Sequence, residues 1–303
     1  MKLFVDTDAG VDDALALLFA LGTPEAELLA IATVDGNVPL QNVVPNVFEV
    51  LHAARTEVPV FVGASRPLVP EPRERATFFH GEDGLGNLKT RKARVRPEKT
   101  PAALALVELA RRHPGELRVV ALGPLTNLAI ALLLEPELPH LLEGLYVMGG
   151  AHTGRGNTRR RAAEFNFAAD PEAAHAVLHA FSRVTLLTWE TTLAHPLPWE
   201  THEALSRRFS FYRKITGHTA RYLRGKGQAG LLIPDPLAMA VALFPELKTE
   251  TEEIHALIEL GGVHTRGMLV TGEGASNAEL VLGVDLAGFQ ARFEAALLRA
   301  LGE

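Results

Sequence analysis

Hydrophobic and polar positions alternate in blocks along most of the chain. Short apolar runs rich in β-forming residues are followed by amphipathic stretches of helical period. This order is typical of a mostly parallel β-sheet covered by helices. Strands are expected at residues 3–5, 28–34, 59–62, 117–122, 145–148 and 184–188, and helices at 14–21, 43–55, from 101 onward, 126–134 and 171 to about 181.

The rest of the chain completes this picture. Residues 67–97 are rich in proline, glycine and charge, and are interpreted as one long loop of the kind that is often functional. Residues 199–223 and 286–301 are expected to be helical, whereas 253–282 alternates in the manner of antiparallel strands. No linker divides the chain. We therefore predict an α/β fold with a mostly parallel, open, Rossmann-like sheet, and a single domain over residues 1–303.

Composition limits the classes of function. The 303 residues are 47% hydrophobic and include no cysteine, which excludes disulfides and thiolate chemistry and fits a reducing cytoplasm. The net charge is −6, and the densest basic run, residues 159–161, is only three arginines long, so no nucleic-acid partner is expected. No secretory signal or membrane-spanning stretch is expected either. The predicted location is the cytoplasm.

Four carboxylates lie within eight residues where the first strand meets the first helix: Asp6, Asp8, Asp12 and Asp13. Acidic residues favour a helix N-terminus, which could explain one or two of them. Four ionised carboxylates this close repel one another and require a cation. Because neither cysteine nor a histidine pair is adjacent, the cluster favours Ca²⁺ or Mg²⁺ over Zn²⁺.

Residues 6–14, DTDAGVDDA, resemble the N-terminal signature of the inosine-uridine-preferring nucleoside hydrolases, which usually reads DTDPGIDDA. Ala9 stands where proline is commoner. Further blocks follow in the family's order, and the ordered set is far more specific than any one of them. They are residues 35–37 (DGN), 80–81 (HG), 83–86 (DGLG), 122–129 (LGPLTNLA), 148–150 (MGG), 164–167 (EFNF), 170–174 (DPEAA) and 235–238 (DPLA).

The resemblance implies calcium-dependent hydrolysis of the N-glycosidic bond of ribonucleosides to free base and ribose, by a metal-bound water. It also implies a homodimer or homotetramer that acts in nucleoside catabolism. Asp8 would be the catalytic base. The implied calcium ligands are Asp8, Asp13, the backbone carbonyl of Leu122, and Asp235. The implied substrate contacts are Asp12 and Asn166 to ribose hydroxyls, Asn37 to the water and sugar, and Glu164 and Asn157 to the 5′-hydroxyl, with Asp6 behind the metal ligands.

The sequence departs from the family at the leaving group. Many members carry a histidine before the late aspartate, but Pro234 stands there and has no proton to donate. His80, in the long loop, is therefore the candidate acid, because histidine titrates near neutral pH. Aromatic stacking on the base is the other route, from Phe78, Phe79, Trp189 or Tyr222.

Simpler explanations remain open for several of these residues. Asp235 and Asp170 each precede a proline and could be helix caps. Glu164 and Asn166 alternate along an expected extended run and could both be solvated. The run after Asn157 is one residue longer than usual, and its arginines, 159–161, could be a solvated loop or favour an anionic substrate. Two other functions also remain: a Mg²⁺ phosphohydrolase with Asp6 or Asp8 as nucleophile, and a non-catalytic nucleoside or ribose binder with structural calcium.

Overall fold

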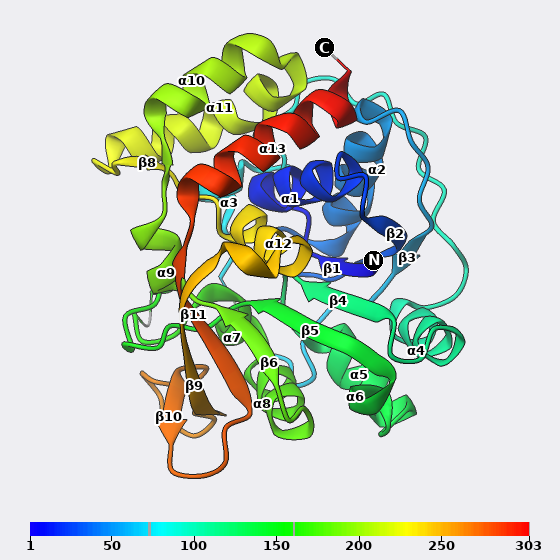
Figure 1. Ribbon diagram of the computed structural model, residues 1–303, viewed down its shortest axis with the longest axis vertical. Helices are drawn as coiled ribbons and strands as arrows, with labels where there is room; N and C mark the ends of the chain where they lie inside the picture. Colours follow the sequence, from blue (N-terminus) through cyan, green and yellow to red (C-terminus); the bar gives the residue numbers. More distant parts are fainter. Residues whose placement is uncertain (72–73, 160, 303) are drawn as a thin grey trace.

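The computed structural model describes residues 1–71, 74–159 and 161–302 (Figure 1). Within these residues, nine strands form one sheet in the order β10-β9-β11-β6-β5-β4-β1-β2-β3. The strands are β1 (Lys2–Thr7), β2 (Glu27–Thr33), β3 (Val60–Val62), β4 (Leu117–Ala121), β5 (Leu142–Met148), β6 (Val184–Leu187), β9 (Lys248–Ile258), β10 (Leu269–Gly272) and β11 (Ala278–Val284). A separate pair, β7 (Leu197–Pro198) and β8 (Gly230–Leu231), is antiparallel.

Helices cover both faces of the sheet (Figure 1). One face carries α1 (Val11–Leu21), α2 (Leu40–Ala53), α12 (Pro234–Leu243) and α13 (Leu286–Leu301), and the other carries α4 (Ala102–Arg112), α5 (Thr126–Leu134), α6 (Leu138–Leu141) and α8 (Pro171–Ala180). The remaining helices are α3 (Thr77–His80), α7 (Phe165–Ala169), α9 (Trp189–Ala194), α10 (Trp199–Arg208), α11 (Ser210–Gly225) and the 3₁₀ turn η1 (Pro245–Leu247).

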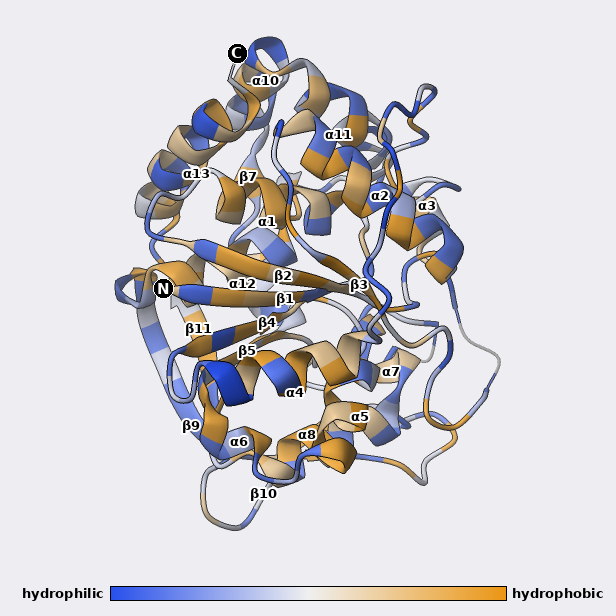
Figure 2. Cartoon of the chain, turned by 90° about the vertical axis from the view of Figure 1, so that its right-hand side faces the viewer, coloured by the Kyte–Doolittle hydropathy of each residue, from blue (hydrophilic) through white to orange (hydrophobic). Residues whose placement is uncertain are grey.

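The central strands are buried on both faces, as expected for a parallel sheet between helical layers. Successive side chains of β1 point to opposite faces, so Phe4 belongs to the core under α4 and α5 while Val5 belongs to the core under α1 and α12. Figure 2 shows the hydrophobic strands between the two helical layers. The mostly parallel sheet with helices on both faces confirms the predicted fold class.

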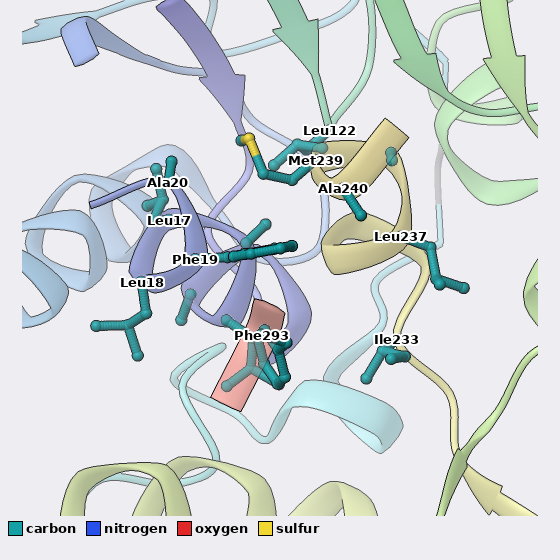
Figure 3. Close-up of a cluster of buried hydrophobic side chains, with 14 of the residues drawn as sticks. Leu17, Leu18, Phe19, Ala20, Leu122, Ile233, Leu237, Met239, Ala240 and Phe293 are labelled. Carbon is teal, nitrogen blue, oxygen red and sulfur yellow. The ribbon is translucent and has the colours of Figure 1, made fainter. Parts of the chain in front are cut away.

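An aromatic cluster joins α1 to the C-terminal helix. The Phe19 ring meets the rings of Phe289 and Phe293 edge to face, with centroids 5.9 and 5.5 Å apart. Leu237 and Met239 of α12 belong to the same fully buried core (Figure 3). This packing fixes α12 against α1, and the first turns of these two helices both carry acidic residues.

The strand order reverses between β1 and β4. From β1 the chain adds β2 and β3 on one side, and it then adds β4, β5 and β6 in parallel on the other. In open α/β sheets, the crevice at the carboxyl ends of the strands on either side of such a reversal is the usual place for a ligand. The acidic turn after β1 and Leu122 after β4 both lie at this crevice.

The structure differs locally from the sequence-based expectations. Helix α2 begins at Leu40 rather than 43, which places Pro45 in its second turn, where the missing N–H leaves one helical hydrogen bond unmade. The expected long loop contains the short helix α3. The C-terminal strands are antiparallel as expected, except that β11 runs parallel to β6. No helix in the described parts of the chain has the length and hydropathy to cross a membrane.

Candidate active site

Asp13 is the most firmly held carboxylate of the acidic turn. Its Oδ1 accepts a 2.5 Å hydrogen bond from the Thr7 hydroxyl, and its Oδ2 accepts from the Gly10 N–H at 2.8 Å. The side-chain amide of Asn37 also donates to Oδ2 at 3.3 Å. Asp13 is the third residue of α1, so its carboxylate lies against the positive end of that helix.

Asp8 is held on one side and open on the other. Its Oδ2 accepts a 2.6 Å hydrogen bond from the Asn37 N–H. Gly36 packs against the same oxygen so closely that a Cβ there would lie 2.0 Å from it. The other oxygen, Oδ1, is fully buried and has no hydrogen-bond partner among the described residues. A buried carboxylate oxygen without a partner is costly unless a ligand satisfies it.

Carboxylates from two helices converge beside Asp8. Oxygens of Asp12, Asp13 and Asp235 lie within 4.8 Å of one another, and all three side chains are buried. Asp235 reaches this cluster from the first turn of α12. The N-cap of α12 is Ile233, so the alternative that Asp235 caps its helix is wrong.

The electrostatics of the cluster favour a bound cation. Burial raises the pKa of Asp12 to about 7. Burial, reinforced by repulsion from neighbouring carboxylates, raises the pKa of Asp8 and of Asp235 well above the usual value. Carboxylates in such surroundings either take up protons or bind a metal ion. Because the side chains offer oxygen ligands, the cluster suits a hard divalent cation.

A second set of residues closes the crevice from α7. Glu164 caps this helix and accepts backbone N–H bonds from Asn166 at 2.9 Å and Gly150 at 3.0 Å. The side-chain amide of Asn166 donates to the Leu122 carbonyl at 2.8 Å. The expected extended run is therefore wrong, because the Glu164 carboxylate begins a helix here. Burial raises the pKa of Glu164 to about 7 despite these bonds.

His80 faces the acidic turn from α3. Its Nδ1 accepts the Val11 N–H at 3.1 Å and lies 3.4 Å from Asp12 Oδ1. An imidazole that accepts at Nδ1 is neutral and carries its proton on Nε2. Burial lowers the pKa of His80 to about 4, although Asp13 opposes this shift. The ring is thus held as a neutral donor.

One cavity of about 410 Å³ connects these groups. Asp8 and Asp13 do not line it and lie behind its wall. Asn157 does line it, and its Oδ1 also accepts the Phe165 N–H at 2.8 Å. The predicted site residues in the cavity wall are Asp12, Asn37, His80, Leu122, Asn157, Glu164, Asn166 and Asp235, and all four candidate aromatic residues, Phe78, Phe79, Trp189 and Tyr222, line it as well.

Comparison with known proteins identifies the family. The family model described as "Inosine-uridine preferring nucleoside hydrolase" matches residues 3–291. The chain belongs to this family. The hydrolase is 35% identical to the non-specific ribonucleoside hydrolase RihC of Shigella boydii over 298 residues, which cover 96% of each chain. It is 34% identical to RihC of Escherichia coli K12, again with 96% of each chain covered.

Solved structures show the same fold. The hydrolase superposes on a purine-preferring ribonucleoside hydrolase from Gardnerella vaginalis with a TM-score of 0.92 over 100% of both chains, at 28% identity. For a structure described as inosine-guanosine nucleoside hydrolase, the TM-score is 0.90 over 98% of both chains, at 30% identity. The prediction of an N-glycosyl hydrolase is confirmed. A non-catalytic binder and a phosphohydrolase are no longer needed to explain the sequence.

Among the polar residues that line the cavity of the hydrolase, the sequence interpretation missed Lys226 and Gln228. Lys226 follows α11, and its N–H bonds the Tyr222 carbonyl at 3.1 Å. The sequence does contain a signal for Lys226. It follows the candidate Tyr222 by four residues, and residues four apart share one face of a helix. Asn157 is followed closely by the three arginines at 159–161. Of the three arginines that follow it, Arg160 lies outside the described residues.

Proposed function

We propose that the hydrolase cleaves the N-glycosidic bond of ribonucleosides to free base and ribose in a calcium-dependent reaction. The observation that carries this proposal is the buried Asp8 carboxylate beside three converging carboxylates. One of its oxygens is held by Asn37, and the other has no hydrogen-bond partner in the described parts of the chain. The names of the relatives, which specify ribonucleosides, support the substrate class.

The residues at the crevice fit a calcium ion. Asp8, Asp13, Asp235 and the Leu122 carbonyl would hold it, since all offer oxygen and calcium takes six to eight oxygen ligands. Asp8 Oδ1, which finds no hydrogen-bond partner among the residues that the structure describes, is independent support for a cation at this place. When bound, calcium supplies positive charge that orients sugar hydroxyls and makes water more acidic.

Asp8 is the proposed base. The reaction needs a water to attack C1′ on the face opposite the departing base, while the ribose develops oxocarbenium character. A carboxylate with a raised pKa is a stronger proton acceptor than an ordinary aspartate, and burial raises the pKa of Asp8. Asn37 fixes the orientation of this carboxylate through its N–H. Asp8 therefore accepts the proton of the attacking water.

The remaining polar residues of the cavity bind the ribose. Asp12 lines the cavity and can accept from a sugar hydroxyl, as can the Asn166 side-chain oxygen, because the Asn166 amide nitrogen is already engaged with Leu122. The Asn37 side chain lines the same wall and is proposed to contact the attacking water and the sugar. Glu164 and Asn157 are proposed to bind the 5′-hydroxyl. We assign His80 a catalytic role as a neutral Nε2–H donor toward the base rather than as a charged acid.

Assembly and location are also part of the proposal. We expect a homodimer or homotetramer in the cytoplasm, with no nucleic-acid or membrane partner, on the strength of the family resemblance. Light scattering after size-exclusion chromatography measures the assembly. A monomer at micromolar concentration would contradict it.

Asp8→Asn tests the assignment of the base. Asparagine keeps an oxygen for the Asn37 N–H but loses the basic carboxylate. Base release should fall by at least about 10³-fold, while calorimetry should still detect nucleoside binding in the presence of calcium. Asp285→Asn is the matched control, because Asp285 caps α13 and does not line the cavity. If Asp8→Asn kept wild-type turnover, Asp8 would not be the base.

A further inference from the structure

The cavity wall contains an aromatic and cationic group beside the ribose-binding residues. The rings of Phe78 and Tyr222 are 5.3 Å apart, those of Phe79 and Tyr222 are 6.2 Å apart, and the Lys226 ammonium lies 5.7 Å from the Tyr222 ring centre. All four side chains line the cavity. With the ribose at the carboxylates, the base of the substrate must meet this remaining wall.

This aromatic wall is built rigidly from two helices. The Thr219 hydroxyl donates to the Phe79 carbonyl at 2.8 Å, and a His218 ring nitrogen lies 3.1 Å from the Phe78 carbonyl. These contacts tie α3 to α11. Lys226 is fixed at the end of α11 by its N–H bond to the Tyr222 carbonyl. This bond places the start of the Lys226 side chain beside Tyr222, and the ammonium lies 5.7 Å from the centre of that ring.

Neither of the other two candidate positions brings a positive charge to the departing base. Pro234 has no N–H, and His80 is held neutral because Val11 donates to its Nδ1. Among the described residues that line the cavity, Lys226 is the only lysine or arginine. Its ammonium makes no ion pair within the described parts of the chain. It is therefore available to a substrate.

We propose that Lys226, held over Tyr222, is a catalytic residue that stabilises the departing base by donating a hydrogen bond to its oxo oxygen. This inference rests on the proposed ribonucleoside hydrolysis. As the C1′–N bond breaks, its electron pair stays on the base and spreads to the ring nitrogens and the oxo oxygen. Water forms the new C1′–O bond and gives its proton to Asp8. The base then takes a proton from solvent as it leaves.

Lysine has three donors and no acceptor, so this contact distinguishes oxo from amino groups. An oxo oxygen accepts from the ammonium, whereas an amino group presents a donor to a donor. At position 6 of the purine, inosine presents an oxo oxygen beside a protonated N1, whereas adenosine presents an amino group beside an unprotonated N1. The contribution of Lys226 to kcat/KM should therefore be large with inosine and small with adenosine.

The experiment compares Lys226→Met and Lys226→Arg with the matched control Lys214→Met. Lys214 is an exposed lysine within α11, and it does not line the cavity. The three substrates are inosine, adenosine and 4-nitrophenyl riboside, whose leaving group is stable without a hydrogen bond. The kcat/KM of each pair is measured with calcium present, and melting temperatures check that the variants are folded.

Lys226→Met should lower kcat/KM for inosine by about tenfold, the effect of one charge-assisted hydrogen bond at a partly solvated site. The values for adenosine and 4-nitrophenyl riboside should change less than about twofold. Lys226→Arg should recover part of the inosine activity, and Lys214→Met should change nothing. Equal losses with all three substrates, or no loss with inosine, would overturn the role of Lys226. A wild-type enzyme that hydrolyses neither these three substrates nor uridine and cytidine would instead refute the proposed function.

Discussion

Gly36→Ala should displace the proposed base without touching the substrate. The added Cβ would lie 2.0 Å from Asp8 Oδ2 and 2.7 Å from its Cγ. Real Cβ contacts essentially never fall below 3.0 Å. The carboxylate must therefore move by at least about 1 Å or the Gly36 backbone must move by as much, and either movement disturbs the Asn37 N–H bond to Asp8.

A displacement of about 1 Å in a catalytic group can cost about 10²-fold in rate, which corresponds to about 2.7 kcal/mol in the barrier. Ribose release should thus show a kcat lower by about two orders of magnitude, with circular dichroism and melting temperature reporting a folded protein. Gly225→Ala is the control, because a Cβ at Gly225, at the end of α11, meets nothing within 4 Å. A folded Gly36→Ala variant with kcat within threefold of wild type would refute the placement of the base.

Three further predictions concern the cation and the substrate. Calcium at 100 times its Kd should stabilise the protein by about 2.7 kcal/mol, roughly 5 °C in melting temperature. The folded apoprotein holds protons on carboxylates such as Asp12 between about pH 4 and 7, so its stability falls as pH rises in that range. The calcium-induced shift should therefore be larger at pH 8 than at pH 5.5, and the reverse order would contradict a carboxylate site. In Glu164→Gln, an amide N–H would face the backbone N–H donors of Gly150 and Asn166. The free energy of unfolding, measured with urea, should fall by about 1–3 kcal/mol. An unchanged urea midpoint would refute this contact. If Arg159 and Arg161 favour anions, inosine 5′-phosphate should be hydrolysed with a higher kcat/KM than inosine, and no preference would exclude that role.

The sequence predicted the fold well where local pattern and burial agree. The helix at 126–134 and the helix at 286–301 were predicted to the residue, the first as a continuous apolar run and the second from apolar positions at helical spacing. The helix expected at 43–55 instead spans Leu40–Ala53, with Pro45 inside it. Long-range packing decided that helix, and a single sequence does not contain that information.

The sequence motifs predicted which residues form the site, but they did not predict how these residues are arranged. Spacing alone placed the acidic turn at a strand end, but it could not show that Asp8 and Asp13 lie behind the cavity wall while Asp12 lines it. The capping role of Glu164 depends on backbone N–H groups of α7, a helix too short for a periodic signal. The neutral state of His80 depends on Val11, which is 69 residues away in the chain.

Ribose release before and after calcium removal is the most direct test of the proposed chemistry. The enzyme is assayed with inosine and uridine, then with a chelator that binds Ca²⁺ in preference to Mg²⁺, and then after either ion is restored. Because Asp8, Asp13, Asp235 and the Leu122 carbonyl are proposed to hold calcium, hydrolysis should cease with the chelator and return with Ca²⁺. Hydrolysis that continues at the original rate in the chelator would contradict the calcium-dependent mechanism.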